Sequence, residues 1–295
     1  MLASAKNTIT LEGAAQLNGI KIVNSKGKGL KFSIKMVDNL FSSEDNVKVE
    51  GTANRDVLKN SGNKATVLGY AGDDTIGNTG NNISIDGGAG KDSISNDASK
   101  VSINGGTGND TVRNYGLQVS INGGAGNDTV DNYGSQVTIN AAKGNDTISN
   151  LGSQVSINGG SGNDYINNII SLNNEAQPSE GADNVTINGG AGNDYIDSWN
   201  SAGKVTLKGG DGKDTFIYKP GEGADTIFDY ESGDILKILT ADGKSGGSFT
   251  DSYFSGSSLT ITISGGGTVT FETVSAGDSI NINDKSYTIS GSKLK

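Results

Sequence analysis

The sequence contains no cysteine and no histidine, and only 2 prolines and 1 tryptophan in 295 residues. Without cysteine the chain can form neither disulfides nor thiolate metal sites, and a cysteine nucleophile is excluded. Without histidine it lacks the commonest general base. The many carboxylates are better explained as cation ligands than as glycosidase pairs, so we expect no enzyme.

Positive charge and long apolar segments are also scarce. Lysine and arginine number 23 against 33 acidic residues, a formal net charge of -10. This balance speaks against nucleic acid or an anionic membrane as a partner, because both require a basic surface. No apolar run approaches the roughly 18 residues that cross a bilayer, and the first 13 residues lack the apolar core of a secretory signal. We therefore expect no membrane span, and cations as the natural partner.

Glycine is abundant, with 46 residues, and it lies within an 18-residue repeat that runs without a gap from residue 47 to 168. An aspartate recurs at this spacing at Asp56, Asp74, Asp92, Asp110, Asp128, Asp146 and Asp164. An asparagine does the same at Asn60, Asn78, Asn96, Asn114, Asn132, Asn150 and Asn168. Two series of isoleucine, valine and leucine residues keep the same step. A strict short period predicts a solenoid whose successive turns stack on one another.

Each repeat reads as two short strands joined by a glycine-rich turn. In residues 101–114, alternation places Val101, Ile103 and Val112 inward, and Ser102 and Thr111 outward. The predicted fold is therefore all-β: a flattened parallel β-roll, or β-solenoid, with 18-residue turns.

Three regions follow from this pattern. Residues 1–46, with short alternating segments, are predicted to form an N-terminal β cap, and the in-phase Asp38 and Leu40 are interpreted as a coincidence or a decayed turn. Residues 47–217 are predicted to form the roll, with an insertion at about 169–184 that leaves as a loop. Residues 218–295 are predicted to form a final turn and an antiparallel C-terminal β cap, which includes the segment from Tyr218 to Leu239.

The glycine-rich turn, for example residues 105–110, carries the candidate chemistry. Glycines let the backbone fold back and expose its carbonyls, while the aspartate places a carboxylate beside them. Grooves between stacked turns would supply the 6 to 8 oxygens that Ca²⁺ takes, whereas Mg²⁺ demands stricter geometry. The candidate calcium ligands are Asp74, Gly87, Ala89, Asp92, Gly105, Thr107, Asp110, Gly123, Ala125, Asp128, Asp146, Gly159, Ser161, Asp164, Gly189, Ala191, Asp194, Gly209, Asp211 and Asp214.

These turns, repeated in phase from residue 47 to about 239, closely resemble the glycine-rich nonapeptide repeats of RTX proteins. The resemblance implies a parallel β-roll that binds several Ca²⁺ ions. It also implies a secreted bacterial protein, exported by a type I system through an uncleaved C-terminal signal and folding in extracellular calcium. Residues 218–234 look like the way many RTX rolls end.

Three departures from that pattern lead to further expectations. The second edge carries asparagine in place of the motif, so we expect one row of ions. The turn Ala141-Ala142-Lys143 lacks both glycines and adds an ammonium group; because alanine takes a positive φ less cheaply than glycine, its flanking sites should be weak. The turn from Gly51 to Asp56 is expected to be metal-free.

Several alternatives remain open. The protein is expected to be a structural component of a surface layer, matrix, filament or adhesin, or else the calcium-folding and secretion part of a larger RTX enzyme, such as a protease, lipase or polysaccharide epimerase. The row Thr111, Thr129 and Thr147 suggests an ice-binding solenoid as a minor alternative. The asparagine row is interpreted as backbone-bonded amides and not as a ligand site. Tyr115 and Tyr133 are interpreted as surface packing in preference to a sugar platform. Possible partners besides calcium are cell-surface or matrix glycans and further copies of the chain, associating end to end.

Overall fold

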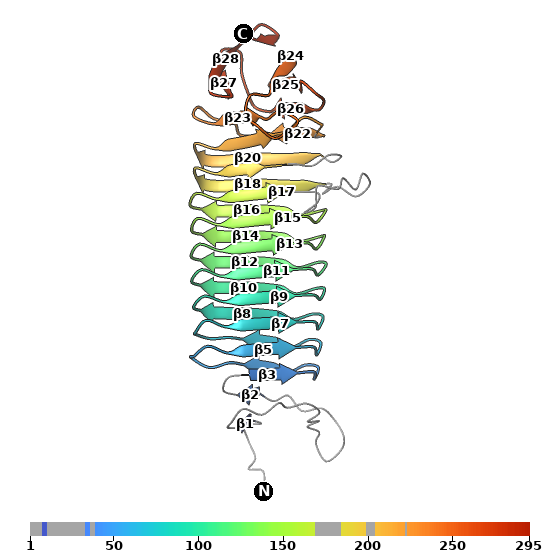
Figure 1. Ribbon diagram of the computed structural model, residues 1–295, viewed down its shortest axis with the longest axis vertical. Coiled ribbons are helices and arrows are strands. Elements are labelled where there is room, and N and C mark those ends of the chain that lie inside the picture. Colours follow the sequence, from blue (N-terminus) through green and yellow to red (C-terminus); the bar gives the residue numbers. More distant parts are fainter. Residues whose placement is uncertain (1–7, 11–32, 36–38, 169–183, 199–203, 222) are drawn as a thin grey trace. The chain divides into compact units, whose positions relative to one another are not determined.

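The computed structural model describes residues 8–10, 33–35, 39–168, 184–198, 204–221 and 223–295, and every regular element in these ranges is a β-strand. They contain no helix that could cross a membrane. The chain divides into two compact units, Met1–Gly134 (unit 1) and Ser135–Lys295 (unit 2). Within each unit, strands of two sheets alternate from one turn to the next (Figure 1).

Unit 1 contains two parallel sheets. The first has, in spatial order, β1 (Thr8–Thr10), β2 (Ser33–Lys35), β4 (Lys48–Glu50), β6 (Thr66–Leu68), β8 (Ser84–Ala89), β10 (Ser102–Thr107) and β12 (Ser120–Ala125). The second has β3 (Asn39–Ser42), β5 (Val57–Asn60), β7 (Thr75–Asn78), β9 (Ser93–Asn96), β11 (Thr111–Asn114) and β13 (Thr129–Asn132).

The strand register places equivalent residues of successive turns side by side. In the first sheet Ile103 lies opposite Ile85 and Ile121, and in the second sheet Val112 lies opposite Ile94 and Val130. All of these side chains are at most 1% exposed. The inward rows of the two sheets therefore form a thin apolar core, and burial of these rows fixes the 18-residue register. This confirms the predicted parallel β-roll.

The parallel stack begins earlier than the sequence pattern indicates. β3 pairs with β5 so that Leu40 lies opposite Leu58, and β2 pairs with β4 so that Ile34 lies opposite Val49. Of the two interpretations of Leu40, the coincidence is wrong and the decayed turn fits, because Leu40 is a buried core residue, 2% exposed, in a strand of the stack. Asp38, the other in-phase residue, lies outside the described residues.

Unit 2 continues the same arrangement. Its first sheet has β14 (Thr138–Lys143), β16 (Ser156–Ser161), β18 (Val185–Gly192), β20 (Val205–Gly212), β22 (Ala224–Ile227), β26 (Thr268–Phe271), β25 (Ser258–Ile263) and β24 (Phe249–Ser255). Its second has β15 (Thr147–Asn150), β17 (Tyr165–Asn168), β19 (Tyr195–Asp197), β21 (Thr215–Tyr218), β23 (Ile235–Ile238), β27 (Ser279–Ile282), β28 (Lys285–Ser290) and β29 (Lys293–Leu294). β16 and β18 keep their register, with Ile157 opposite Ile187. The predicted insertion between them lies, except for Asn184, outside the described residues.

The predicted cap boundary needs a correction at the C-terminal end. β22 and β23 pair in parallel with β20 and β21, so the segment from Tyr218 to Leu239 extends the roll and is not antiparallel as predicted. β26 and β27 also pair in parallel, with β22 and β23. Antiparallel pairing is found in β24–β25–β26 and in β27–β28–β29, which confirms the predicted hairpin of residues 259–271.

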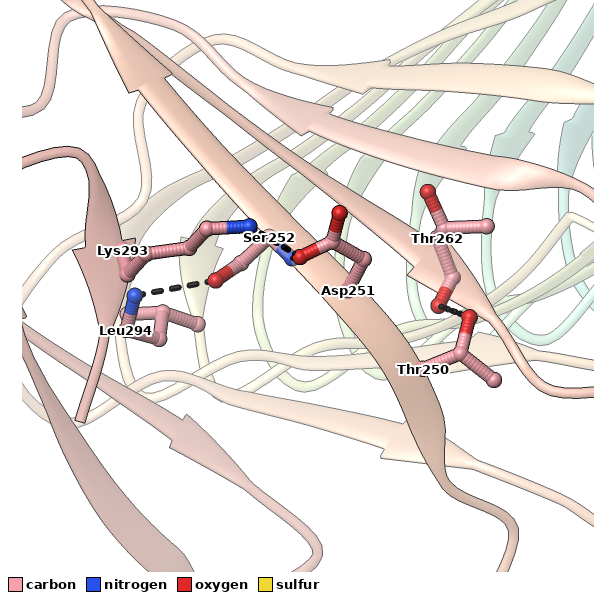
Figure 2. A network of polar contacts seen from close by, with 6 residues as sticks. All are labelled: Thr250, Asp251, Ser252, Thr262, Lys293 and Leu294. Atoms are coloured by element: carbon pink, nitrogen blue, oxygen red, sulfur yellow. Dashed lines mark hydrogen bonds and ion pairs between the residues drawn. The ribbon is translucent and has the colours of Figure 1, made fainter.

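The last strand is attached to β24 by side-chain bonds. The Leu294 backbone N–H donates a hydrogen bond to Ser252 Oγ at 2.9 Å, and the Lys293 ammonium contacts the Asp251 carboxylate (Figure 2). These contacts hold β29 against an edge strand of the cap, which is then less available for pairing with another chain.

Candidate metal sites along the glycine-rich edge

The aspartates of the repeat are buried inside the glycine-rich turns. Gly106 and Gly108 adopt φ values of 115° and 123°, so the chain reverses within a few residues and brings Asp110 back beside Gly105. The same geometry recurs along the row. Every aspartate from Asp56 to Asp234 at this position is only 1–2% exposed: Asp56, Asp74, Asp92, Asp110, Asp128, Asp146, Asp164, Asp194, Asp214 and Asp234.

One oxygen of each carboxylate links neighbouring turns. The Asp92 backbone N–H donates a hydrogen bond of 2.8 Å to Asp110 Oδ1. The same bond, at 2.7–2.9 Å, joins Asp56 to Asp74, Asp74 to Asp92, Asp110 to Asp128, Asp146 to Asp164, Asp164 to Asp194, Asp194 to Asp214 and Asp214 to Asp234. Oδ1 therefore stabilises the stack itself.

The other oxygen is buried without a protein donor in six of these side chains. These are the Oδ2 atoms of Asp74, Asp92, Asp110, Asp164, Asp194 and Asp214. Burial, as the largest cause, raises the pKa of Asp74 and Asp194 to about 7, and that of Asp92 and Asp214 to about 6. A buried anionic oxygen without a donor is strongly unfavourable, so these atoms require a cation or a proton.

A backbone carbonyl of the next turn lies close to five of these oxygens, those of Asp74, Asp92, Asp110, Asp164 and Asp194. A point in the Cβ direction of Gly87 is 2.5 Å from Asp92 Oδ2 and 2.5 Å from the carbonyl oxygen of Gly105. The strand register passes from Asn104 directly to Gly106, so Gly105 is not paired in the ladder. The same convergence, with distances of 2.2–2.7 Å, is found at four further sites: beside Gly69 for Asp74 and Gly87, Gly105 for Asp110 and Gly123, Gly159 for Asp164 and Gly189, and Gly189 for Asp194 and Gly209. It is also found beside Gly51 for Asp56 and Gly69, at 2.7 Å.

This set of oxygens fits a hard cation. Each position combines one carboxylate with a carbonyl from the following turn, and both are ligands that Ca²⁺ prefers. No group of three acidic side chains is found in the described part of the chain. A Ca²⁺ ion would therefore take most of its oxygens from the backbone.

The carbonyl of the third residue of the predicted turn bonds to the backbone of the preceding turn. The carbonyl oxygens of Ala89, Thr107, Ala125, Ser161 and Ala191 accept hydrogen bonds of 2.7–2.8 Å from glycine N–H groups of the preceding turn. These carbonyls keep a second lone pair, but the convergence of aspartate and first-glycine oxygens does not include them. Asp211, at the same position, is exposed and lies opposite Ala191.

The turns at the two ends of the row differ from the central ones. Asp56 Oδ2 accepts hydrogen bonds from the Thr52 backbone N–H at 2.5 Å and from Thr52 Oγ1 at 3.0 Å. Asp234 Oδ2 accepts one from the Glu231 N–H at 2.8 Å. Sequence reasoning did not assign Asp234, although its Gly233-Asp234 pair was a usable signal. In both side chains the second oxygen is stabilised by protein donors, which a metal-free turn requires.

The turn Ala141–Asp146 keeps the register but not the glycines. Ala142 lies opposite Gly160, and it is Ala142, not Ala141, that takes the positive φ, at 83°. The expectation of a positive φ at Ala141 is therefore wrong. Lys143 is exposed and lies opposite Ser161.

The asparagines of the second edge bond to one another and to the turn backbone, and only the end atoms Asn60 Oδ1 and Asn168 Nδ2 of the described row lack a partner. Asn96 Nδ2 donates to the Ala98 carbonyl at 2.7 Å and to Asn114 Oδ1 at 2.8 Å. Its Oδ1 accepts from Asn78 Nδ2 at 2.8 Å and from the Ala98 N–H at 3.3 Å. The interpretation of this row as backbone-bonded amides is confirmed.

A further amide row was missed by sequence reasoning. Half-buried asparagines on the outer face of the first sheet are linked at 2.8–2.9 Å: Asn104 to Asp86, Asn122 to Asn104, Asn158 to Asn140 and Asn188 to Asn158. The 18-residue spacing of Asn104, Asn122, Asn140 and Asn158 could have revealed it.

The two tyrosines of the return turn stack on each other. The ring centroids of Tyr115 and Tyr133 are 4.6 Å apart with an interplanar angle of 9°. Stacked rings use the faces between them, which favours surface packing over a sugar platform. The outward threonine row is interrupted, because Ser93 lies opposite Thr111 and Tyr165 opposite Thr147.

The glycine-rich turns match a known sequence family. A model of the RTX calcium-binding nonapeptide repeat matches 4 segments, residues 101–113, 119–132, 155–168 and 181–200. The chain carries RTX calcium-binding repeats. The matched segments contain Asp110, Asp128, Asp164 and Asp194, so the RTX assignment covers both units and supports Ca²⁺ as the cation of this edge.

Other comparisons add less. A search of curated proteins finds no match. Among solved structures, the chain is similar to the extracellular lipase LipA from Serratia marcescens, with 14% sequence identity and a TM-score of 0.22. The comparison covers 90% of this chain and 40% of the lipase chain.

Proposed function

We propose that the protein is a secreted calcium-binding β-roll that folds when it binds Ca²⁺ and has a structural role outside the cell. That role would be in a surface layer, matrix, filament or adhesin. The observation that carries the calcium part is the series of six buried Oδ2 atoms without protein donors, five of them beside a carbonyl of the next turn. Bacterial secretion is typical of RTX repeat proteins and supports the location.

Different atoms of the same turns serve folding and cation binding. The Oδ1 atoms and the apolar rows hold successive turns in register, and the Oδ2 atoms and first-glycine carbonyls face the cation. Bound Ca²⁺ supplies the positive charge that offsets the burial of these carboxylates. Binding free energy then becomes folding free energy.

Circular dichroism tests the calcium-dependent fold. In excess EDTA at neutral pH the strand signal should be lost, and it should return when Ca²⁺ is added back. Mg²⁺ at the same concentration should restore it less, because Mg²⁺ demands a stricter octahedral geometry. An unchanged spectrum in EDTA would show that the core and the asparagine edge suffice. Electron micrographs with and without Ca²⁺ test for assemblies.

The alternative is the calcium-folding and type I secretion part of a larger RTX enzyme. In either case we propose that this chain is not itself an enzyme, since it has no histidine or cysteine and its repeated aspartates are occupied in the stack. The length of the natural reading frame separates the two alternatives.

A shallow surface hollow in unit 1 favours an acidic glycan as an additional partner. The residues that line it include Lys64, Lys100, Ser84, Ser102 and Ser120, and no acidic residue lines it. Cation and hydroxyl rows suit an extended polyanion. Retention on an acidic polysaccharide column should fall for Lys64→Ala/Lys100→Ala and not for Lys143→Ala. End-to-end association remains a further proposal, for which sedimentation at rising Ca²⁺ should detect species above 30.1 kDa.

A further inference from the structure

One turn of the glycine-rich edge differs at a position where the others agree. The first residue of the turn is glycine at Gly69, Gly87, Gly105, Gly123, Gly159, Gly189 and Gly209, but it is alanine at Ala141. These first glycines do not take a positive φ, which is confined to the second and fourth positions. Backbone conformation therefore does not explain why glycine is needed there.

Space explains it. A Cβ added at Gly159 would lie 2.3 Å from Asp164 Oδ2 and 2.4 Å from the Gly189 carbonyl oxygen, and one at Gly189 would meet Asp194 Oδ2 at 2.3 Å. Real methyl groups do not approach oxygen so closely. The first glycine is thus required for the carboxylate and the next carbonyl to converge.

Ala141 carries a methyl group at this position. Its neighbours keep the usual register, with Asn140 opposite Asn158 and Ala142 opposite Gly160, so its Cβ has the direction seen at the glycines. Ala141 is 0% exposed, and the methyl group has no route to solvent. In the geometry of the glycine turns, a methyl group at this position would meet both the Asp146 carboxylate and the Gly159 carbonyl.

We propose that the Ala141 methyl group closes the cation site that Asp146 and Gly159 would otherwise form, and so interrupts the row of calcium ions. This inference rests on the proposed calcium binding. It differs from a charge effect of Lys143, whose side chain is exposed two residues further along. In a stack coupled through nearest neighbours, a missing site also removes the coupling of the site next to it, so loading is less steep.

The test is the Ala141→Gly variant of the full chain, with Ala142→Gly and Lys143→Ser as matched controls from the same turn. Native mass spectrometry counts bound Ca²⁺, and isothermal titration reports the steepness of loading. Ala141→Gly should bind one more ion per chain than the unmodified protein and load in a steeper transition. Both controls should bind the unmodified number.

A reciprocal variant completes the experiment. Gly189→Ala should lose one ion, and circular dichroism of the same sample checks that it folds; Gly159→Ala is the second choice if it does not. If the unmodified protein binds calcium and Ala141→Gly gains no ion, the methyl-group inference is wrong. If Lys143→Ser alone gains the ion, the ammonium group is the cause and the inference also fails. If no variant binds calcium, the proposed function itself is overturned.

Discussion

The two edges of the roll have the same residue spacing and are equally buried, but the hydrogen bonds of their polar side chains differ. On the asparagine edge each amide has donors and acceptors, and Asn96 uses both in contacts with Asn78, Ala98 and Asn114. On the glycine edge each carboxylate has acceptors only. Its Oδ1 finds a backbone N–H, whereas Oδ2 of residues such as Asp92 finds no protein donor.

This difference shows why one edge needs an ion and the other does not. A stack of identical amides satisfies itself, because each residue brings its own donor. A stack of identical carboxylates cannot, and like charges about 5 Å apart also repel one another. The end turns support this reading, since Asp56 and Asp234 obtain extra donors from Thr52 and Glu231.

The largest effect is expected when a carboxylate is placed on the amide edge. In Asn96→Asp the new side chain cannot donate to the Ala98 carbonyl or to Asn114 Oδ1, so two buried acceptors lose their donor. The unfolding free energy should fall by about 3–5 kcal/mol, even in saturating calcium. Denaturant unfolding measures it. A loss below about 1 kcal/mol would show that this edge tolerates charge.

The second expected effect concerns Asp225, a buried carboxylate away from the glycine edge. Ser198 Oγ donates to it at 2.7 Å and the Val205 N–H at 3.3 Å, but burial still raises its pKa to about 6. A raised pKa in the folded state stabilises the protein below the ordinary value near 4, and this contribution is lost as pH rises through about 6.

Asp225→Asn should therefore remove part of the pH dependence. In saturating calcium the unmodified protein should lose about 1.4 kcal/mol between pH 5 and pH 8 from this group, whereas the variant should not. Thermal unfolding at the two pH values measures the difference. Parallel pH profiles for the two proteins would mean that Asp225 stays ionised throughout.

A smaller, local effect is expected from the reverse exchange. Asp110→Asn keeps an oxygen for the Asp92 N–H but replaces Oδ2 with a donor directed toward the Gly123 carbonyl. The variant should lose at least one Ca²⁺ per chain and should be more stable than the unmodified protein in EDTA. Isothermal titration and unfolding in EDTA measure these two results. Unchanged stoichiometry would remove Asp110 from the ligand set.

The smallest effect is expected for Asp56→Asn at the end of the row. Its Oδ2 already receives two donors from Thr52, so no calcium ion should be lost. The variant is also the matched control for Asp110→Asn. Equal losses of bound ions in the two variants would contradict a metal-free first turn.

Several features of the fold and the site could be predicted from the sequence because they are repeated locally. The 18-residue period of isoleucine, asparagine and aspartate determines which side chains meet, since a stack brings equal positions together. The pairing of Leu40 with Leu58 became visible only in the stack, because the residues around Leu40 do not follow the repeat. The amide row of Asn104 and Asn122 was overlooked because a single asparagine in a strand is typical of an ordinary surface residue, and the bond between the two appears only when the turns stack.

The period, the parallel roll and the row that carries the carboxylates follow from the repeated residues alone. Which carboxylate oxygens obtain protein donors depends on the folded turns, because most of those donors are backbone groups whose direction the turn sets. The joining of β26 and β27 to the parallel stack across an antiparallel cap likewise depends on the folded chain, since such pairings are non-local. At Ala141 the sequence shows one added methyl group, and the position of Asp146 and Gly159 in space determines what that methyl group displaces.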